Sequence, residues 1–284
     1  MANHTWASNA NVPGLFRLYC PFAVGDTTIA LSLIGAYCAQ RGITRPCPIV
    51  KPGHSDLVDL FPSIREKIVI SDNEMHQSKL EFHAQHIYET PAHLYCHFPV
   101  HPGTCWLERK PYTPGMDFYD EYKRDVFHLP INTPVQRPEE PLLPLQRAQE
   151  LSRMADPART ILLVPHAYSV KWTSAAFWNR LASVLAASGY TVYTNTGLPA
   201  EQPIAGTLPL RLTLSELLFF TSRIRNTVAG RCGLCDLLAM AGRKMIVIDP
   251  MNSIELERTG GTAVHRISAH NGDDVLNREV LRFI

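Results

Sequence analysis

Residues that could bind an anion gather late in the chain, at residues 226–250. A short β-type run is followed by the polar corner Arg231-Cys232-Gly233, and an apolar helical pattern then runs from Leu234 to Ala241. The N–H groups at a helix N-terminus lack helical partners, and together with the helix dipole they favour a negative charge. The stretch therefore predicts a strand, a turn, a helix and a second strand, with an anion bound at the turn.

A second candidate is Asp26, which follows Gly25 where the first predicted strand meets the first predicted helix. In open α/β sheets ligands bind beyond the carboxyl ends of the strands. An aspartate in that place can act as a general base or hold a ligand. Aspartate is also a good helix N-cap, and the local sequence leaves both interpretations open.

Lys171 lies in the loop after a predicted strand at residues 160–164. A lysine at the carboxyl end of a strand can neutralise a phosphate. A solvated surface lysine is the alternative interpretation.

Cys232 and Cys235 have the spacing of a redox motif at a helix N-terminus, where a thiolate is stabilised. In thioredoxin folds that motif belongs to the first βα turn of a small domain, whereas here it lies near the end of the chain. Small residues at a turn that faces a ligand are the favoured interpretation, and a redox role is the minor one.

Histidines at positions 93, 97 and 101 are spaced so that a continuous helix would align them for a metal. Pro91, Pro99 and Pro102 interrupt that helix, so no metal is expected. P-loop, dinucleotide-binding and nucleophile-elbow motifs are absent from the sequence.

Elements of α/β type are expected to position these residues in both halves of the chain. In the first half we predict strands at 15–19, 48–51 and 67–70 and helices at 27–41, 54–61, 77–86 and 116–127. In the second half we predict strands at 160–164, 190–193, 226–229, 244–248 and 262–267, and helices at 145–155, 174–188, 213–223, 234–241 and 273–284. This alternation is typical of parallel sheets with helices on their faces.

Five prolines between Pro130 and Pro144 mark a linker. The predicted domains are therefore residues 1–135 and 136–284. Just before the linker, the charged residues of the helix at 116–127 are expected on its solvent side; they are Asp120, Glu121, Lys123 and Arg124.

Composition excludes several classes of protein. The 284 residues carry a formal charge of +1 and are 45% hydrophobic, which excludes global disorder and gives no basic footprint for nucleic acid. No apolar run approaches the roughly 20 residues that span a bilayer, and the first residues do not have the pattern of a signal peptide. Seven cysteines in no framework spacing suit reduced thiols. We expect a soluble, cytoplasmic α/β protein.

Taken in order, several segments resemble the heptosyltransferase-like glycosyltransferases, which form glycosyltransferase family 9 of the GT-B superfamily. The first is Val24-Gly25-Asp26 before an apolar helix, and the second is residues 54–70, which contain a helix, a P-x-I motif and a strand. The proline linker is the third, and the segments PHAYSVKW, NTGLPAE and VAGRCGLCDLLAMAG follow it. The resemblance covers nearly the whole chain. It implies an α/β protein of GT-B type, with two Rossmann-like domains facing each other across a cleft. The acceptor would bind to the first domain and a nucleotide-sugar donor to the second.

The resemblance also implies roles for individual residues. Asp26 matches the base that deprotonates the acceptor hydroxyl, Ser169 and Lys171 match contacts to the donor phosphates, and Glu201 matches a ligand of the nucleotide. The turn at the helix N-terminus would complete the donor site with Arg231, Cys232, Gly233 and Leu234.

Two positions depart from the family pattern. Arg231 stands where the family has aspartate, and Asp236 stands where it has histidine. The donor sugar is therefore left open, and the resemblance implies a hexosyl- or heptosyl-type transferase. Arg231 would instead place a cation beside a diphosphate.

The resemblance thus implies a metal-independent transferase without a cofactor. It would move a sugar from a nucleotide-diphospho-sugar donor to a hydroxyl of a saccharide or glycolipid acceptor, in polysaccharide or lipopolysaccharide biosynthesis. Such an enzyme would be cytoplasmic, with a peripheral contact on the inner membrane face. Three alternatives stay open: a non-catalytic nucleotide- or sugar-binding homologue, a nucleotide-sugar epimerase of GT-B type and, as the outsider, a redox protein.

Overall fold

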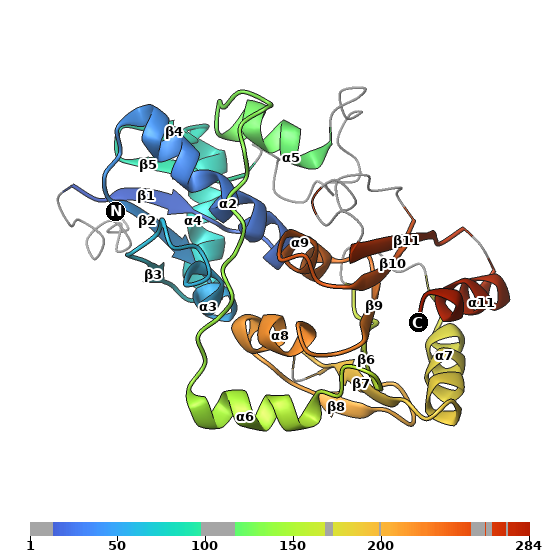
Figure 1. The fold of residues 1–284 in the computed structure, drawn as a ribbon. Helices are drawn as coiled ribbons and strands as arrows, with labels where there is room; N and C mark the ends of the chain where they lie inside the picture. Colours follow the sequence, from blue (N-terminus) through green and yellow to red (C-terminus); the bar gives the residue numbers. More distant parts are fainter. Residues whose placement is uncertain are drawn as a thin grey trace. The chain divides into compact units, whose positions relative to one another are not determined.

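The computed structural model describes residues 14–97, 117–167, 173–198, 200–250, 259, 263–270 and 272–284. The chain divides into two compact units, Met1–Arg137 and Pro138–Ile284. The boundary falls inside the proline-rich segment, and each unit contains one largely parallel sheet (Figure 1).

The sheet of the first unit has the strand order β3-β2-β1-β5-β4. Its strands are β1 (Phe16–Tyr19), β2 (Pro46–Val50), β3 (Ile68–Val69), β4 (Glu89–Thr90) and β5 (His93–Tyr95). All neighbours pair in parallel except β4 and β5, which form an antiparallel edge. Strand order therefore reverses beside β1, which has β2 on one side and β5 on the other.

Alternating side chains of β1 reach helices on both faces of this sheet. Phe16 packs against Tyr37 of α2 (Val24–Arg41), with 5.9 Å between the ring centroids. Tyr19 packs on the other face against Phe82 of α4 (Asp72–Gln85), at 4.8 Å. The remaining helical pieces of the unit are η1 (Pro52–His54), α3 (Ser55–Val58), α5 (Phe118–Glu121) and the π-helical turn η3 (Tyr122–Val126).

The expectation that the charges around residue 120 face solvent is wrong for three of the four. Asp120, Glu121 and Lys123 are buried, and Lys123 Nζ donates to Asp120 Oδ1 at 3.4 Å and to the Ile131 carbonyl at 2.8 Å. Because Lys123 and Asp120 are partners inside the unit, burial leaves neither of these two charges uncompensated. Arg124 alone is on the solvent side, paired with Asp125.

The second unit has a six-stranded sheet in the order β11-β10-β9-β6-β7-β8. Its strands are β6 (Thr160–Val164), β7 (Thr191–Asn195), β8 (Leu208–Leu210), β9 (Asn226–Gly230), β10 (Met245–Asp249) and β11 (Val264–Ser268), all parallel. The order reverses between β6 and β9, as it reverses beside β1 in the first unit. β8 lies outside the predicted elements.

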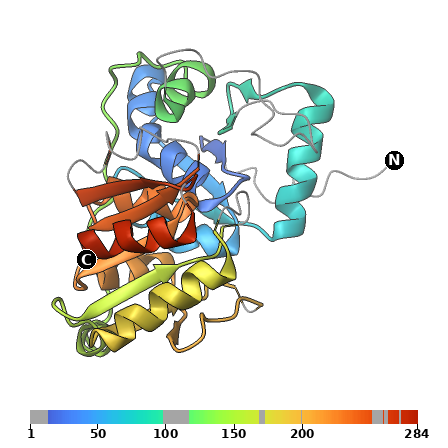
Figure 2. The ribbon, with the colours of Figure 1, turned by 90° about the vertical axis from the view of Figure 1, so that its right-hand side faces the viewer.

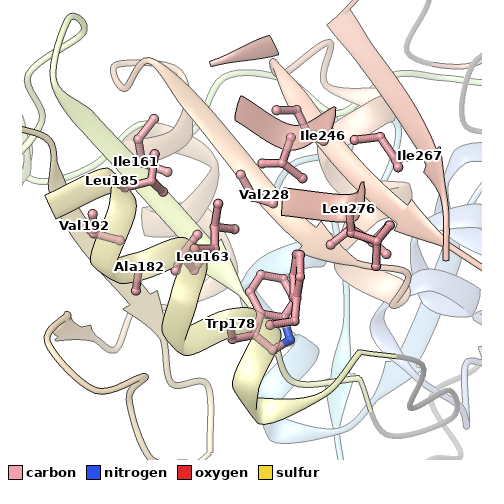
Figure 3. Packing of buried hydrophobic residues seen from close by; sticks show 14 of the residues in the cluster. Ile161, Leu163, Trp178, Ala182, Leu185, Val192, Val228, Ile246, Ile267 and Leu276 are labelled. Carbon is pink, nitrogen blue, oxygen red and sulfur yellow. The ribbon is translucent and has the colours of Figure 1, made fainter. Parts of the chain in front are cut away.

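Helices α7 (Ala175–Ala187) and α11 (Asp273–Phe283) lie side by side on one face of this sheet (Figure 2). Between them and the strands, fully buried residues such as Leu163, Phe177, Val228 and Leu276 form the main core (Figure 3). Burying a side chain of this size contributes about 1.5–3 kcal/mol. The opposite face carries α8 (Leu214–Thr221) and α9 (Gly233–Met240) (Figure 1).

Helix α8 begins directly after a capping residue. Thr213 and Glu216 form a capping box at α8. Arg147 of α6 (Leu145–Met154) also donates to Glu216, over 2.6 Å, which ties α6 to α8.

Among the described residues, no helix is long and apolar enough to cross a membrane.

Candidate functional site

Asp26 lies on the third residue of α2, directly after β1. The helix begins three residues earlier than predicted, at Val24, and its N-cap is Ala23 rather than Asp26. The alternative that Asp26 is the N-cap is therefore wrong. Instead, the Asp26 carboxylate accepts a hydrogen bond from the backbone N–H of Ala23.

Two side chains from distant parts of the first unit contact the same carboxylate. The hydroxyl of Tyr122 donates to Asp26 Oδ1 at 3.1 Å, and Nε2 of His97 lies 3.5 Å from that oxygen. His97 follows β5, the neighbour of β1, so the contact joins the carboxyl ends of two adjacent parallel strands at the point where strand order reverses. Ligands of open α/β sheets bind at such points.

These contacts lower the pKa of Asp26. Burial raises the pKa of the carboxyl, but the hydrogen bond and charge of His97 and the donors of Tyr122 and Ala23 lower it further, so the net pKa is below its ordinary value. The pKa of Tyr122 is raised by its burial and by the Asp26 charge, which keeps the phenol protonated as a donor. The Asp26 side chain is still 23% exposed, so an ionised carboxylate reaches solvent.

Aromatic and basic groups adjoin this carboxylate. The His97 ring stacks on Phe22 with 3.6 Å between the ring centroids. Nζ of Lys79, a residue of α4, lies 4.3 Å from the centroid of the Phe22 ring. Burial, together with the charge of Lys51, lowers the pKa of Lys79. On the next residue of α2, Thr27 Oγ1 lies 3.1 Å from His54 Nδ1.

The histidines do not form the helical row that would favour a metal. His93 lies in β5 and contacts Thr90 Oγ1 at 3.0 Å, His97 faces Asp26, and His101 is outside the described residues. Within the described part of the chain, no group of three or more histidine, cysteine or carboxylate side chains could hold a metal ion.

In the second unit, the predicted donor residues follow three adjacent strands. The loop with Ser169 and Lys171 comes after β6, Glu201 after β7, and the turn at residues 231–234 after β9. The parallel pairing places these carboxyl ends at one edge of the sheet, on both sides of the reversal in strand order. Ser169 and Lys171 themselves lie outside the described residues.

Glu201 braces its own loop. Its Oε2 accepts the backbone N–H of Leu198 at 3.0 Å, and its side chain is only partly exposed. At the neighbouring turn, Cys232 is the N-cap residue of α9, Gly233 is the first helical residue and Leu234 is buried. The helix start matches the predicted turn to within one residue.

Arg231 forms a buried ion pair with Asp236. Nη1 donates to Asp236 Oδ2 at 2.9 Å and Nη2 donates to Oδ1 at 3.1 Å, and the two side chains are 12% and 4% exposed. Nη1 also donates to the Cys232 carbonyl at 2.8 Å. The two residues that depart from the family pattern thus complement each other, and the pair fixes the turn into α9. The positive charge of Arg231 is offset locally by Asp236.

Sequence reasoning missed His97, Tyr122 and the pairing of Arg231 with Asp236. A signal existed for His97, since it follows a strand and adjoins Cys96 in an apolar run, but the short β5 could not be aligned with β1 from sequence. Nothing in the sequence around Tyr122 distinguishes it from the other tyrosines of its helix.

No protein-family model and no curated protein sequence matches the chain. Solved structures do. The E. coli ADP-heptose lipopolysaccharide heptosyltransferase II aligns with a TM-score of 0.60 at 13% identity, covering 94% of this chain and 98% of that one. A family 9 glycosyl transferase from Veillonella parvula aligns at 0.59 and 11%, covering 94% and 90%. E. coli heptosyltransferase WaaC with ADP aligns at 0.55 and 15%, covering 95% and 100%.

The chain therefore has the GT-B fold of the heptosyltransferases, with two Rossmann-like units, as the sequence motifs predict. At 11–15% identity these likenesses establish the fold and leave the activity to be argued from the site.

Proposed function

We propose that the protein is a glycosyltransferase that moves a sugar from a nucleotide-diphospho-sugar to a hydroxyl of a saccharide or glycolipid acceptor. The observation that carries the proposal is the Asp26 carboxylate, which is held ionised by His97, Tyr122 and Ala23 at the strand-order reversal of the first unit, and is part-open to solvent. A general base needs these two properties, a deprotonated form and access to the substrate proton.

In the proposed reaction Asp26 accepts the proton of the acceptor hydroxyl. The acceptor oxygen then bonds to the anomeric carbon of the donor, and the bond from that carbon to the diphosphate breaks with its electron pair on the leaving oxygen. Because negative charge grows on the diphosphate, the transition state is stabilised by groups that favour an anion. We assign this role to the N-terminal turn of α9 at Gly233 and Leu234, and to Ser169 and Lys171.

Arg231 contributes to the proposed donor site both through its charge and through its bond to the turn. Its pairing with Asp236 reduces its net attraction for an anion, while its bond to the Cys232 carbonyl holds the turn in place. Glu201 is assigned to the nucleotide. The donor is left as a nucleotide-diphospho-sugar, although solved neighbours are described with ADP and ADP-heptose.

The proposal needs no metal, because the helix turn and Lys171 supply the positive potential. Transfer should therefore survive dialysis against EDTA with less than about a twofold loss. A loss restored by one divalent ion would contradict metal independence and leave the base assignment intact.

The first test is a screen of nucleotides and nucleotide sugars for thermal stabilisation, because a ligand that binds the folded state raises its apparent stability. Absence of a response to any nucleotide would overturn the proposal. With a donor in hand, Glu201→Gln and Lys171→Ala should weaken its binding, and Glu139→Gln on the exposed linker serves as the matched control.

The second test separates catalysis from binding. Asp26→Asn should lower transfer by at least about 10²-fold while nucleotide binding stays within about twofold of wild type. Full transfer activity in this variant would show that Asp26 is not the base. Donor binding without transfer to any acceptor, in the wild type, would indicate a binding protein instead.

A further inference from the structure

Cys232 and Cys235 form a close thiol pair at the start of α9. Their sulfur atoms lie 4.0 Å apart, Cys232 is partly exposed and Cys235 is fully buried behind it. The two residues that separate them are the first helical residues of α9, and helical geometry places Cα atoms three residues apart about 5 Å from each other. That distance lies inside the range of about 4.4–6.8 Å that a disulfide bridges.

The two thiols differ in acidity. A hydrogen bond from the Cys235 thiol lowers the pKa of Cys232; burial opposes the shift, and the N–H groups of Leu234 and Cys235 and the charge of Arg231 add to it. The same hydrogen bond and burial raise the pKa of Cys235 well above its ordinary value. An accessible thiol of low pKa beside a buried one of high pKa is the arrangement of an attacking and a resolving cysteine.

The other described cysteines lack this arrangement. Cys20, Cys38, Cys47 and Cys96 are all buried. Burial raises the pKa of both Cys38 and Cys47 to about 11, and it also raises the pKa of Cys96. Thiols of that kind react slowly, so they supply internal controls.

We propose that Cys232 and Cys235 are a thiol–disulfide exchange site whose oxidant is a small-molecule disulfide such as oxidised glutathione. The Cys232 thiolate attacks one sulfur of the oxidant, and the first glutathione thiolate leaves. The Cys235 sulfur then attacks Cys232, its proton passes to the departing sulfur, and the second glutathione leaves. The protein loses two protons and two electrons in total, and the oxidant takes them up to become two thiols.

Oxidation acts on a turn that the structure already holds in place. Closing the disulfide brings the sulfur atoms from 4.0 Å to about 2 Å and ends the Cys235 contact with the Gly230 carbonyl, which is 3.6 Å from its sulfur. The effect on binding rests on the proposed donor site: if that site is correct, the oxidised turn should bind the nucleotide diphosphate about tenfold more weakly.

The test uses the whole chain, reduced and then equilibrated in glutathione buffers of increasing oxidised fraction. Intact mass should fall by about 2 Da at intermediate ratios, peptide mapping after alkylation should join Cys232 to Cys235, and excess thiol should reverse the change. Cys232 should react with iodoacetamide at least about tenfold faster than Cys47.

Two variants assign the roles. Cys235→Ser should accumulate a glutathione adduct on Cys232, because no resolving thiol is left, whereas Cys232→Ser should leave Cys235 unmodified. Cys47→Ser should behave as the wild type. If both cysteines stay reduced in the wild type across the whole buffer series, or if Cys232 and Cys47 react equally fast, the proposal is overturned even if a variant fails to fold.

The nucleotide measurement is separate from these outcomes. Disulfide formation without any nucleotide binding in either redox form would support the exchange site and count against the proposed donor site. Equal nucleotide affinity of the oxidised and reduced forms would contradict the coupling alone.

Discussion

The imidazole of His97 and the carboxylate of Asp26 lie 3.5 Å apart, although each follows a different strand of the first sheet. Their contact depends on the parallel pairing of β1 with β5, and it places an imidazole ring beside the carboxylate that we assign as the base. His97 in turn stacks on Phe22, which leaves its ring little freedom to turn away. The lowered pKa of Asp26 is thus a property of the folded unit.

Removing the Tyr122 hydroxyl should raise the pKa of Asp26. In Tyr122→Phe the carboxylate loses a donor at 3.1 Å, so the protonated form becomes relatively more stable. We expect the pKa of Asp26 to rise, and carbon NMR of the labelled carboxyl measures the change. The acid limb of any rate–pH profile should move to higher pH by the same amount. Tyr88→Phe, whose hydroxyl contacts His83, is the control and should not shift Asp26.

Replacing His97 distinguishes its charge from its hydrogen bond. In His97→Gln an amide donor remains near the Nε2 position, and in His97→Phe both donor and charge are lost. The pKa of Asp26 should rise in both variants and more in the second, because His97 lowers it through a hydrogen bond and through charge. Equal carboxyl titrations in wild type and His97→Phe would show that His97 does not hold the base ionised.

Acid should destabilise the first unit through His54. Burial, with the charge of Lys51, lowers the pKa of His54 to about 4 from an ordinary 6.5. Between these values the unfolded chain binds a proton that the folded chain does not, so the free energy of unfolding falls as the pH drops through that window. The full loss is about 3 kcal/mol.

Calorimetry of the whole chain at about pH 7 and about pH 4.5 checks this dependence. In His54→Asn the amide can keep the contact with Thr27 but cannot titrate, so the loss on acidification should shrink. His76→Gln, at an exposed histidine, should keep the wild-type dependence. An unchanged pH dependence in His54→Asn would contradict the assignment.

Breaking the Arg231–Asp236 pair from one side should be costly. Arg231→Met removes the cation that pairs with the buried Asp236 carboxylate, and Asp236→Asn removes the charge that balances Arg231; breaking a buried pair from one side costs about 3–5 kcal/mol. The double variant Arg231→Met/Asp236→Leu should recover most of this loss. The exposed pair Arg180 and Asp274 provides the control, since Arg180→Met should change stability by less than about 0.5 kcal/mol. If the loss of stability in the double variant equals the sum of the losses in the two single variants, the two charges are not coupled.

Elements with strong local patterns could be predicted from the sequence. β6 was predicted with its observed bounds, and the helix predicted from residue 213 begins at Leu214 in α8. The short strands β4, β5 and β8 could not be resolved, because two or three residues are too few to show a period. Their pairing is decided by tertiary contacts.

The candidate site could be predicted only through its chain order. Asp26 was singled out from its place between a strand and a helix, where the local sequence also allowed an N-cap, and its assignment as the base came from the resemblance. Its partners His97 and Tyr122 carry no local mark, because what distinguishes them is the distance to a residue far away in sequence. The burial of Asp120 and Lys123 escaped prediction for the same reason, since the amphipathic pattern does not reveal a second layer over the helix.

The separation of Asp26 from Tyr122 has a consequence for the order of folding. The two residues are 96 positions apart, and β5 must pair with β1 before His97 arrives. While the chain emerges from the ribosome, Asp26 is therefore an ordinary surface carboxylate until most of the first unit has been synthesised. Because contacts this distant in sequence form late, the lowered pKa of Asp26 should report completed folding of the unit, and a truncated chain that ends before residue 93 lacks both His97 and Tyr122 and should show an aspartate with an ordinary pKa.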